Sequence, residues 1–139
     1  MDKKIKHLEM IEGVIERMGN NSFQLKGWTV TLVALVGALA AQGSDKRFFL
    51  IAFIPLFAFW FLDSYYLQLE RKYEVLYKRV ANKEEANIDF NLDINEIEYT
   101  EEEMKRIDYW KCVLSKTECT FYLIIAGSVG VVAMVLILT

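Results

Sequence analysis

The sequence predicts an all-α membrane protein, in which three transmembrane helices extend into a cytoplasmic helical stalk and a short extended acidic segment separates the second helix from the third. Two observations predict this class. Of the 139 residues, 54% are hydrophobic and 25% are charged, and the two kinds occupy separate blocks of the chain. One block, Phe48–Leu62, is continuously apolar, and a helix needs roughly 20 mostly apolar residues to cross a bilayer. Because lipid cannot satisfy backbone amides, such a stretch is expected to be helical.

The blocks divide the chain into four segments. Residues 1–26 form a cytoplasmic amphipathic helix, 27–70 a transmembrane hairpin, 71–120 cytoplasmic helices with an acidic loop, and 121–139 a third transmembrane helix. A tight polar turn, Gln42–Arg47, joins the two helices of the hairpin. Lys and Arg number five before the first span, two in this turn and nine between the second and third spans. The positive-inside rule therefore places the N-terminus in the cytoplasm and the C-terminus outside.

Small residues line one face of the first span. Thr31, Ala34, Ala38 and Ala41 follow one another at spacings of three, four and three. Small side chains let helices approach closely in lipid, where apolar burial alone gives helices no preference for one another. This face is expected to pack against another helix of the same subunit, to contact a second subunit or to line a pore.

Asp63 follows the long apolar block and is expected inside the hydrocarbon or just at its inner edge. A carboxylate at that depth is costly unless it is paired or faces water. Lys26 is expected at comparable depth on the antiparallel first span, so the sequence predicts a Lys26–Asp63 ion pair. The alternative is an aqueous vestibule lined by Asp63. Pro55 lies at the middle of the same span and is expected to kink it, which makes it a candidate hinge.

The second helix is expected to continue past the membrane, because Leu69, Tyr73, Leu76 and Val80 form a coiled-coil-like seam. Apolar and polar residues then alternate over 88–94, the pattern of an extended segment with one buried face. Such a segment lies against helices, pairs with a neighbouring subunit or remains a loop. Thr100 and Glu103 form a capping box, and the helix that begins there is expected to run unbroken into the third span.

Charges of both signs gather in the cytoplasmic segments. Nine acids and no base lie between Glu84 and Glu103; in a ring of subunits they would make a negative mouth that concentrates cations. The acids assigned to this mouth are Glu84, Glu85, Asp89, Asp93, Glu96 and Glu98. The bases that are candidates for binding a phosphate-bearing ligand are Lys3, Lys4, Lys6, Lys72, Lys78, Arg79 and Lys83, although they also satisfy the positive-inside bias.

The sequence contains no pattern that is typical of a catalytic or metal site. A single His7 and two cysteines, Cys112 and Cys119, form no metal-ligand spacing. No nucleophile elbow, phosphate-binding glycine loop or paired-carboxylate signature is present. We therefore expect no enzymatic activity, no metal and no cofactor.

Two stretches, RMGNNSFQLKGWTVTLVALVGAL (Arg17–Leu39) and FWFLDSYYLQLERKYEVLY (Phe59–Tyr77), resemble small membrane proteins of bacterial anti-phage loci. The resemblance is to SLATT-type effectors and to the ion-channel effector of the Hailong system. It implies an oligomeric pore in the bacterial inner membrane that depolarises the membrane when a nucleotide-derived signal changes. The implied partners are further copies of the chain, for example in a tetramer, the lipid bilayer, and a nucleotide or oligonucleotide made by a nucleotidyltransferase.

The resulting hypothesis is a homo-oligomeric channel effector that senses a ligand on its cytoplasmic face. The alternative is a non-conducting membrane adaptor, which would recruit a soluble partner through the amphipathic helix and the acidic loop. Ion flux through liposomes separates the two hypotheses.

Overall fold

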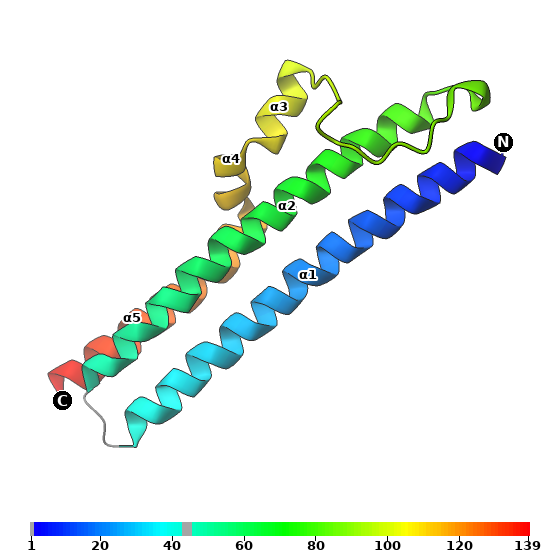
Figure 1. Cartoon of the computed structure of the whole chain (residues 1–139). Coiled ribbons are helices and arrows are strands. Elements are labelled where there is room, and N and C mark those ends of the chain that lie inside the picture. Colours follow the sequence, from blue (N-terminus) through cyan, green and yellow to red (C-terminus); the bar gives the residue numbers. More distant parts are fainter. Residues whose placement is uncertain (1, 43–45) are drawn as a thin grey trace. The chain divides into compact units, whose positions relative to one another are not determined.

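The computed structural model describes residues 2–42 and 46–139, and all regular secondary structure in this part of the chain is helical. The α-helices are α1 (Asp2–Ala41), α2 (Phe53–Ala81), α3 (Glu101–Ile107), α4 (Tyr109–Val113) and α5 (Lys116–Leu138), and the 3₁₀ helices are η1 (Lys46–Ala52) and η2 (Glu85–Asn87) (Figure 1). Three of the helical stretches are long and apolar enough to cross a membrane. The predicted all-α class with three such helices is therefore confirmed.

The chain forms two compact units. The first, called here the polar unit, comprises Met1–Ser22 and Tyr65–Cys112, and the second, the apolar unit, comprises Phe23–Ser64 and Val113–Thr139. Both long helices contribute to both units, so each continues beyond its apolar residues as the sequence predicted. The centre of the predicted hairpin turn, residues 43–45, lies outside the described residues.

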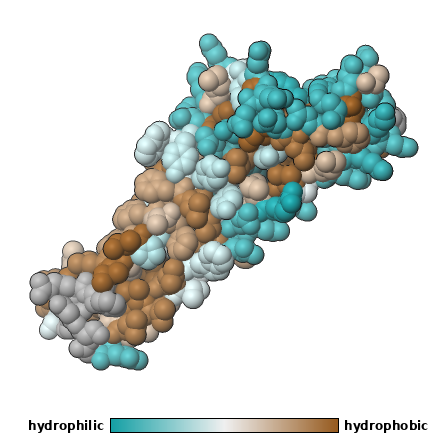
Figure 2. Space-filling model, viewed as in Figure 1, coloured by the Kyte–Doolittle hydropathy of each residue, from teal (hydrophilic) through white to brown (hydrophobic). Residues whose placement is uncertain are grey.

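The apolar unit packs parts of α1, η1, α2 and α5 around a small core. Ala40, Phe49, Ala52, Val129 and Ala133 are buried in it. Much of the remaining apolar surface is exposed, as Figure 2 shows by the hydrophobic colouring that gathers over these helices. Exposed large side chains occur on all three helices, including Leu35, Leu39, Ile54, Leu123, Ile124, Val131, Met134 and Val135. Surfaces of this kind suit lipid or another apolar helix rather than water.

The polar unit has a separate core. Ile11 of α1 packs with Leu76 and Val80 of α2 and with Ile94, and all four side chains are buried. Leu69 and Tyr73 are partly buried against the same cluster, so the predicted seam on α2 faces this core. On α1 the buried position near the N-terminus is His7, whereas Ile5 is 49% exposed.

The acidic segment after η2 lies against the helices of the polar unit, which is one of the three arrangements that its alternating pattern left open. Ile88, Leu92 and Ile97 pack against the core around Ile94. Phe90 breaks the alternation, because its φ of 54° lies in the left-handed region and its ring contacts His7 instead, at a centroid distance of 5.6 Å.

Side chains of this segment satisfy its backbone. The side-chain oxygens of Asp89, Asn91 and Asp93 each accept a hydrogen bond from the backbone N–H two residues later, at 3.1, 2.9 and 2.9 Å. Such Asx turns replace the partners that a sheet would otherwise provide. The Asn91 N–H is also the main reason why the pKa of Asp89 lies below its ordinary value.

The helix that begins at Glu101 does not run unbroken into the third apolar stretch, and this expectation is wrong. It is divided into α3, α4 and α5, with breaks at Asp108 and at Leu114–Ser115. Asp108 has an extended ψ of 130°, and the Ser115 side chain accepts a hydrogen bond from the N–H of Glu118 to cap α5. Short polar side chains are favoured at helix N-caps over helix interiors. Each break therefore falls at a residue type that is a favourable N-cap for the next helix.

The sequence suggested that Pro55 lies at the middle of a helix. In the structure it lies near the start of its α-helix. The chain winds as a 3₁₀ helix over η1, and α2 begins at Phe53, so Pro55 is in the first turn of α2. The first amides of an α-helix have no partner within the helix, and proline is tolerated there.

The predicted capping box at the start of α3 is confirmed. Thr100 Oγ1 accepts from the Glu103 N–H at 3.2 Å, and the Thr100 N–H donates to Glu103 Oε1 at 3.0 Å. The backbone N–H of Thr100 is the main cause that lowers the pKa of Glu103 below its ordinary 4.5, and Arg79, which pairs with the same carboxylate, lowers it further.

Acid is therefore expected to destabilise the polar unit partly through Glu103. Because its pKa is lower in the folded state, the ionised carboxylate stabilises the fold fully above about pH 4.5, and this contribution is lost as the pH falls through the folded-state pKa. Unfolding melts from pH 6 down to about pH 3 should show a smaller loss of stability for Glu103→Gln than for the wild type. Glu102→Gln, an exposed change on the same turn, is the control and should follow the wild type. Parallel curves for all three proteins would contradict the assignment.

Candidate functional site

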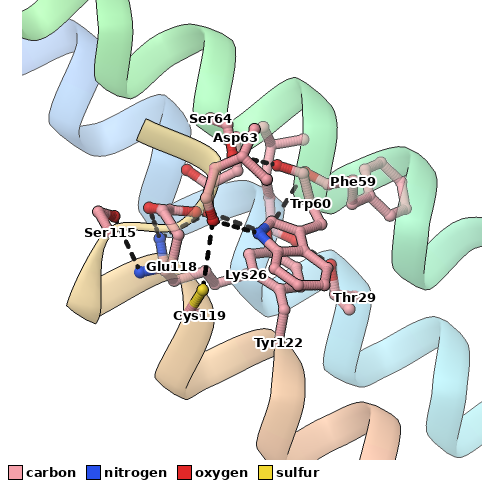
Figure 3. A network of polar contacts seen from close by, with 12 residues as sticks. Lys26, Thr29, Phe59, Trp60, Asp63, Ser64, Ser115, Glu118, Cys119 and Tyr122 are labelled. Carbon is pink, nitrogen blue, oxygen red and sulfur yellow. Dashed lines mark hydrogen bonds and ion pairs between the residues drawn. The ribbon is translucent and has the colours of Figure 1, made fainter. Parts of the chain in front are cut away.

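A cluster of charged side chains is buried within the apolar unit, with one member from each of its long helices (Figure 3). Lys26 Nζ of α1 lies 2.6 Å from Asp63 Oδ2 of α2 and 3.1 Å from Glu118 Oε1 of α5. The Asp63 side chain is fully buried, that of Glu118 is 2% exposed and that of Lys26 is 17% exposed. The structure therefore brings together the two residues that the sequence paired, and adds a second carboxylate.

Aromatic side chains and hydroxyl groups complete the surroundings of the cluster. Tyr122 Oη donates to Asp63 Oδ2 at 2.8 Å, and its ring stacks on Trp60 at a centroid distance of 5.7 Å. Lys26 Nζ lies 5.8 Å above the ring of Phe121 and 5.9 Å above that of Tyr122. The faces of aromatic rings attract a nearby cation. The ammonium is thus held by both carboxylate oxygens and ring faces.

The break before α5 helps to position the cluster. Where α4 ends, the Val113 carbonyl has lost its place in a continuous helix, and it accepts the Trp60 Nε1–H at 3.1 Å and the Cys119 Sγ–H at 3.5 Å. Ser115 then restarts the helix three residues before Glu118. The tryptophan that stacks on Tyr122 is therefore fixed by a backbone group that the break made available.

Glu118 is the functional candidate that the sequence analysis missed. The signal was present as Ser115-Lys116-Thr117-Glu118, the pattern of a helix N-terminus. This pattern predicts that a helix begins at Ser115. Glu118 then lies at one end of the third apolar stretch, the end that is nearer to the polar segments. Lys26 and Asp63 lie at the corresponding ends of the first and second stretches.

The charges of the cluster are unequal in number. Two carboxylates share one ammonium, and Glu118 Oε2 is buried without a hydrogen-bond partner. Burying an unbalanced charge costs far more than burying a balanced pair. Among the described residues, no three His, Cys, Asp or Glu side chains are grouped so that they would hold a metal ion.

The described residues of the chain do not cover the small-residue face of the first span. Thr31, Ala34, Ala38 and Ala41 are all exposed, and Thr31 Oγ1 donates to the Gly27 carbonyl on its own helix. Beside this face runs a groove of about 500 Å³ between α1 and α5. Its lining includes Ala34, Gly37 and Ala41 on one side and Ile125 and Val132 on the other. Packing within one subunit, the first of the three expectations, therefore does not account for this face.

The predicted acidic mouth is only partly a free surface. Glu84, Asp89, Asp93, Glu96 and Glu98 are exposed. The Glu85 carboxylate, however, accepts hydrogen bonds from the N–H groups of Lys3 and Lys4 at 2.8 and 3.2 Å, so it caps the N-terminus of α1. Glu85 thus has a structural role in the polar unit.

The predicted ligand-binding bases are distributed among acids. Arg79 pairs with Glu103, and Lys83 Nζ lies 3.8 Å from Asp89 Oδ1. Lys4 and Lys83 line one surface hollow together with Glu84 and Glu85. Lys78 lines another, which Glu12, Glu74 and Arg106 also line. Lys3, Lys6 and Lys72 line neither of these hollows.

Comparison of the chain with models of protein families, with curated proteins and with solved structures found no match.

Proposed function

We propose that this protein is a homo-oligomeric transmembrane ion channel, a pore-forming effector that depolarises the bacterial inner membrane during anti-phage defence. In this proposal all three apolar helices cross the membrane, the N-terminus and the polar unit are cytoplasmic, and the C-terminus is outside. A nucleotide or oligonucleotide made by a partner enzyme gates the pore.

The buried charge cluster is the observation that supports this proposal best. A helix that serves only as an anchor has no need of charged groups, and ionisable residues within membrane spans are typical of ion pathways and gates. The cluster joins α1, α2 and α5 at one level, so a change in any of its ion pairs would alter the packing of all three helices. That is the behaviour expected of a gate.

Assembly into oligomers is supported by the exposed small-residue face of α1. Small side chains permit the close helix contacts by which membrane helices associate, and the part of the chain that the structure describes leaves this face exposed. The predicted ligand-binding bases lie among acids and do not form one basic pocket. The nucleotide signal is therefore proposed from the resemblance to anti-phage effectors alone.

Potassium efflux from liposomes tests the proposal. Purified protein should assemble in the bilayer and release potassium, with a rate that changes when candidate nucleotides are added. Ala38→Leu, which adds bulk to the small-residue face, should reduce both the oligomer and the efflux towards background. Ala58→Leu makes the same change at an exposed position of α2 and should leave both unchanged. Protein that assembles but passes no ions, with or without nucleotides, would indicate the non-conducting adaptor.

A further inference from the structure

We propose that Glu118 is a proton-binding site, and that its carboxyl group holds a proton when α1, α2 and α5 are packed together at neutral pH. The ligand is a single hydrogen ion exchanged with water. This property belongs to the folded chain whether or not the chain conducts ions, so its test is separate from the flux experiment.

The first argument is the charge balance. Lys26 contacts both Asp63 and Glu118, and one ammonium neutralises one carboxylate. Lys116, in the same first turn of α5 as Glu118, is exposed and does not change this balance. A second ionised carboxylate in this surrounding would be an unbalanced buried charge, which proteins avoid by binding a proton.

The second argument decides which carboxyl group holds the proton. Asp63 Oδ2 has the shorter contact with Lys26, 2.6 Å against 3.1 Å for Glu118 Oε1, and it also accepts the Tyr122 hydroxyl at 2.8 Å. Charge-assisted hydrogen bonds of this kind stabilise the ionised form. Glu118 Oε2 is buried and has no hydrogen-bond partner, so an ionised Glu118 would bury a negative oxygen that no donor stabilises. Glu118 is therefore the carboxyl group to which the proton is assigned.

The titratable groups around Glu118 come from every helix of the cluster. They are Lys26 on α1, Asp63 on α2, and Tyr122 and Cys119 on α5 (Figure 3). Tyr122 is already a donor to Asp63, and Cys119 donates its thiol to the Val113 carbonyl. Protonation of either carboxyl group would restore the balance with Lys26, and the shorter contacts of Asp63 leave Glu118 as the group that binds the proton.

A structural consequence follows for α5. When Glu118 loses its proton to water, the cluster holds two negative charges against one positive charge, and the packing of α5 against α1 and α2 is weakened. Folding then takes up a proton, so the stability of the apolar unit should fall as the pH rises. Glu118→Gln keeps the shape of the protonated group and should remove this dependence.

Infrared spectroscopy of the protein in lipid tests the assignment directly. The wild type at neutral pH should show the carbonyl band of a protonated carboxyl group, and carboxyl-¹³C glutamate should shift this band whereas labelled aspartate should not. The band should be absent in Glu118→Gln and retained in Glu102→Gln, an exposed control. A band that shifts with labelled aspartate, or no such band, would overturn the proposal.

Thermal unfolding supplies a second measurement that does not require the infrared band. Glu118→Gln should be at least as stable as the wild type at neutral pH, and its melting temperature should change less between neutral and alkaline pH. If sodium rather than a proton balances the charge, stability at fixed pH will rise when sodium replaces choline in the buffer. That result would overturn the proposal, and the isotope experiment on the wild type decides the question even if the variant does not fold.

Discussion

Replacing Lys26 with Met should lower the free energy of unfolding by about 3–5 kcal/mol at neutral pH, the range found when one partner of a buried ion pair is removed. The substitution keeps the length of the side chain but removes the ammonium that contacts Asp63 and Glu118. The Asp63 carboxylate then lies buried without a balancing charge, and Glu118 loses its contact with the ammonium. Removing one partner of a buried ion pair costs far more than replacing the whole pair with well-packed apolar residues, because the charged partner that remains is still desolvated.

The loss of stability in the Lys26→Met variant is expected to depend on pH. With Lys26 absent, the cluster can be buried only when both carboxyl groups are protonated, so the folded state binds more protons than the unfolded state and stability rises as the pH falls. Unfolding in detergent micelles, followed by circular dichroism at neutral and mildly acidic pH, would measure this rescue. Lys111→Met removes a charge from an exposed position and should change stability by no more than about 0.5 kcal/mol. Equal effects of the two substitutions would contradict the buried pair.

Truncating Ile11 to Ala should destabilise the polar unit by about 2–5 kcal/mol, the usual cost of such a change in a core. Ile11 is fully buried against Leu76, Val80 and Ile94. Ile94 belongs to the acidic segment, so the cavity loosens the contact that holds this segment against α1 and α2. Protease cleavage between Glu85 and Ile97 should accelerate in parallel with the loss of stability.

Ile5→Ala is the matched control for this prediction. It makes the same change on the same helix, at a side chain that is 49% exposed, and it should cost less than about 1 kcal/mol because surface changes are usually small. Denaturation monitored together with cleavage of the acidic segment distinguishes the two variants. If Ile5→Ala were as damaging as Ile11→Ala, the polar unit would have a different core.

The helical class and one ion pair could be predicted because they depend on the distribution of residue types along the chain. Separate apolar blocks predict long helices whatever their detailed packing. In an antiparallel hairpin, residues just outside the two apolar stretches reach the same level, which is sufficient to bring Lys26 near Asp63. The capping box at Thr100 and Glu103 is likewise a local pattern with a local cause.

The helix breaks, the position of Glu118 and the 3₁₀ winding could not be predicted, because hydropathy does not determine where a helix ends or how it winds. The helical spacing of apolar residues continues across Asp108 and Ser115, so it does not reveal that the helix ends and restarts there. The level of Glu118 depends on where α5 begins, and for that reason it escaped notice among ordinary polar residues. Hydropathy also does not distinguish 3₁₀ from α winding, which is why Pro55 was expected in the interior of an α-helix and lies instead in a first turn.

The side chains of Asp89, Asn91 and Asp93 also affect how this segment meets other polypeptides. They occupy the amides of Asn91, Asp93 and Asn95, which are donors that this sequence could otherwise offer to a strand of another polypeptide. An exposed strand edge normally recruits further strands through such donors, which is how sheets grow into fibrils. Here these three donors are already engaged, so an alternating, strand-like sequence is exposed without offering them to the strands of other polypeptides.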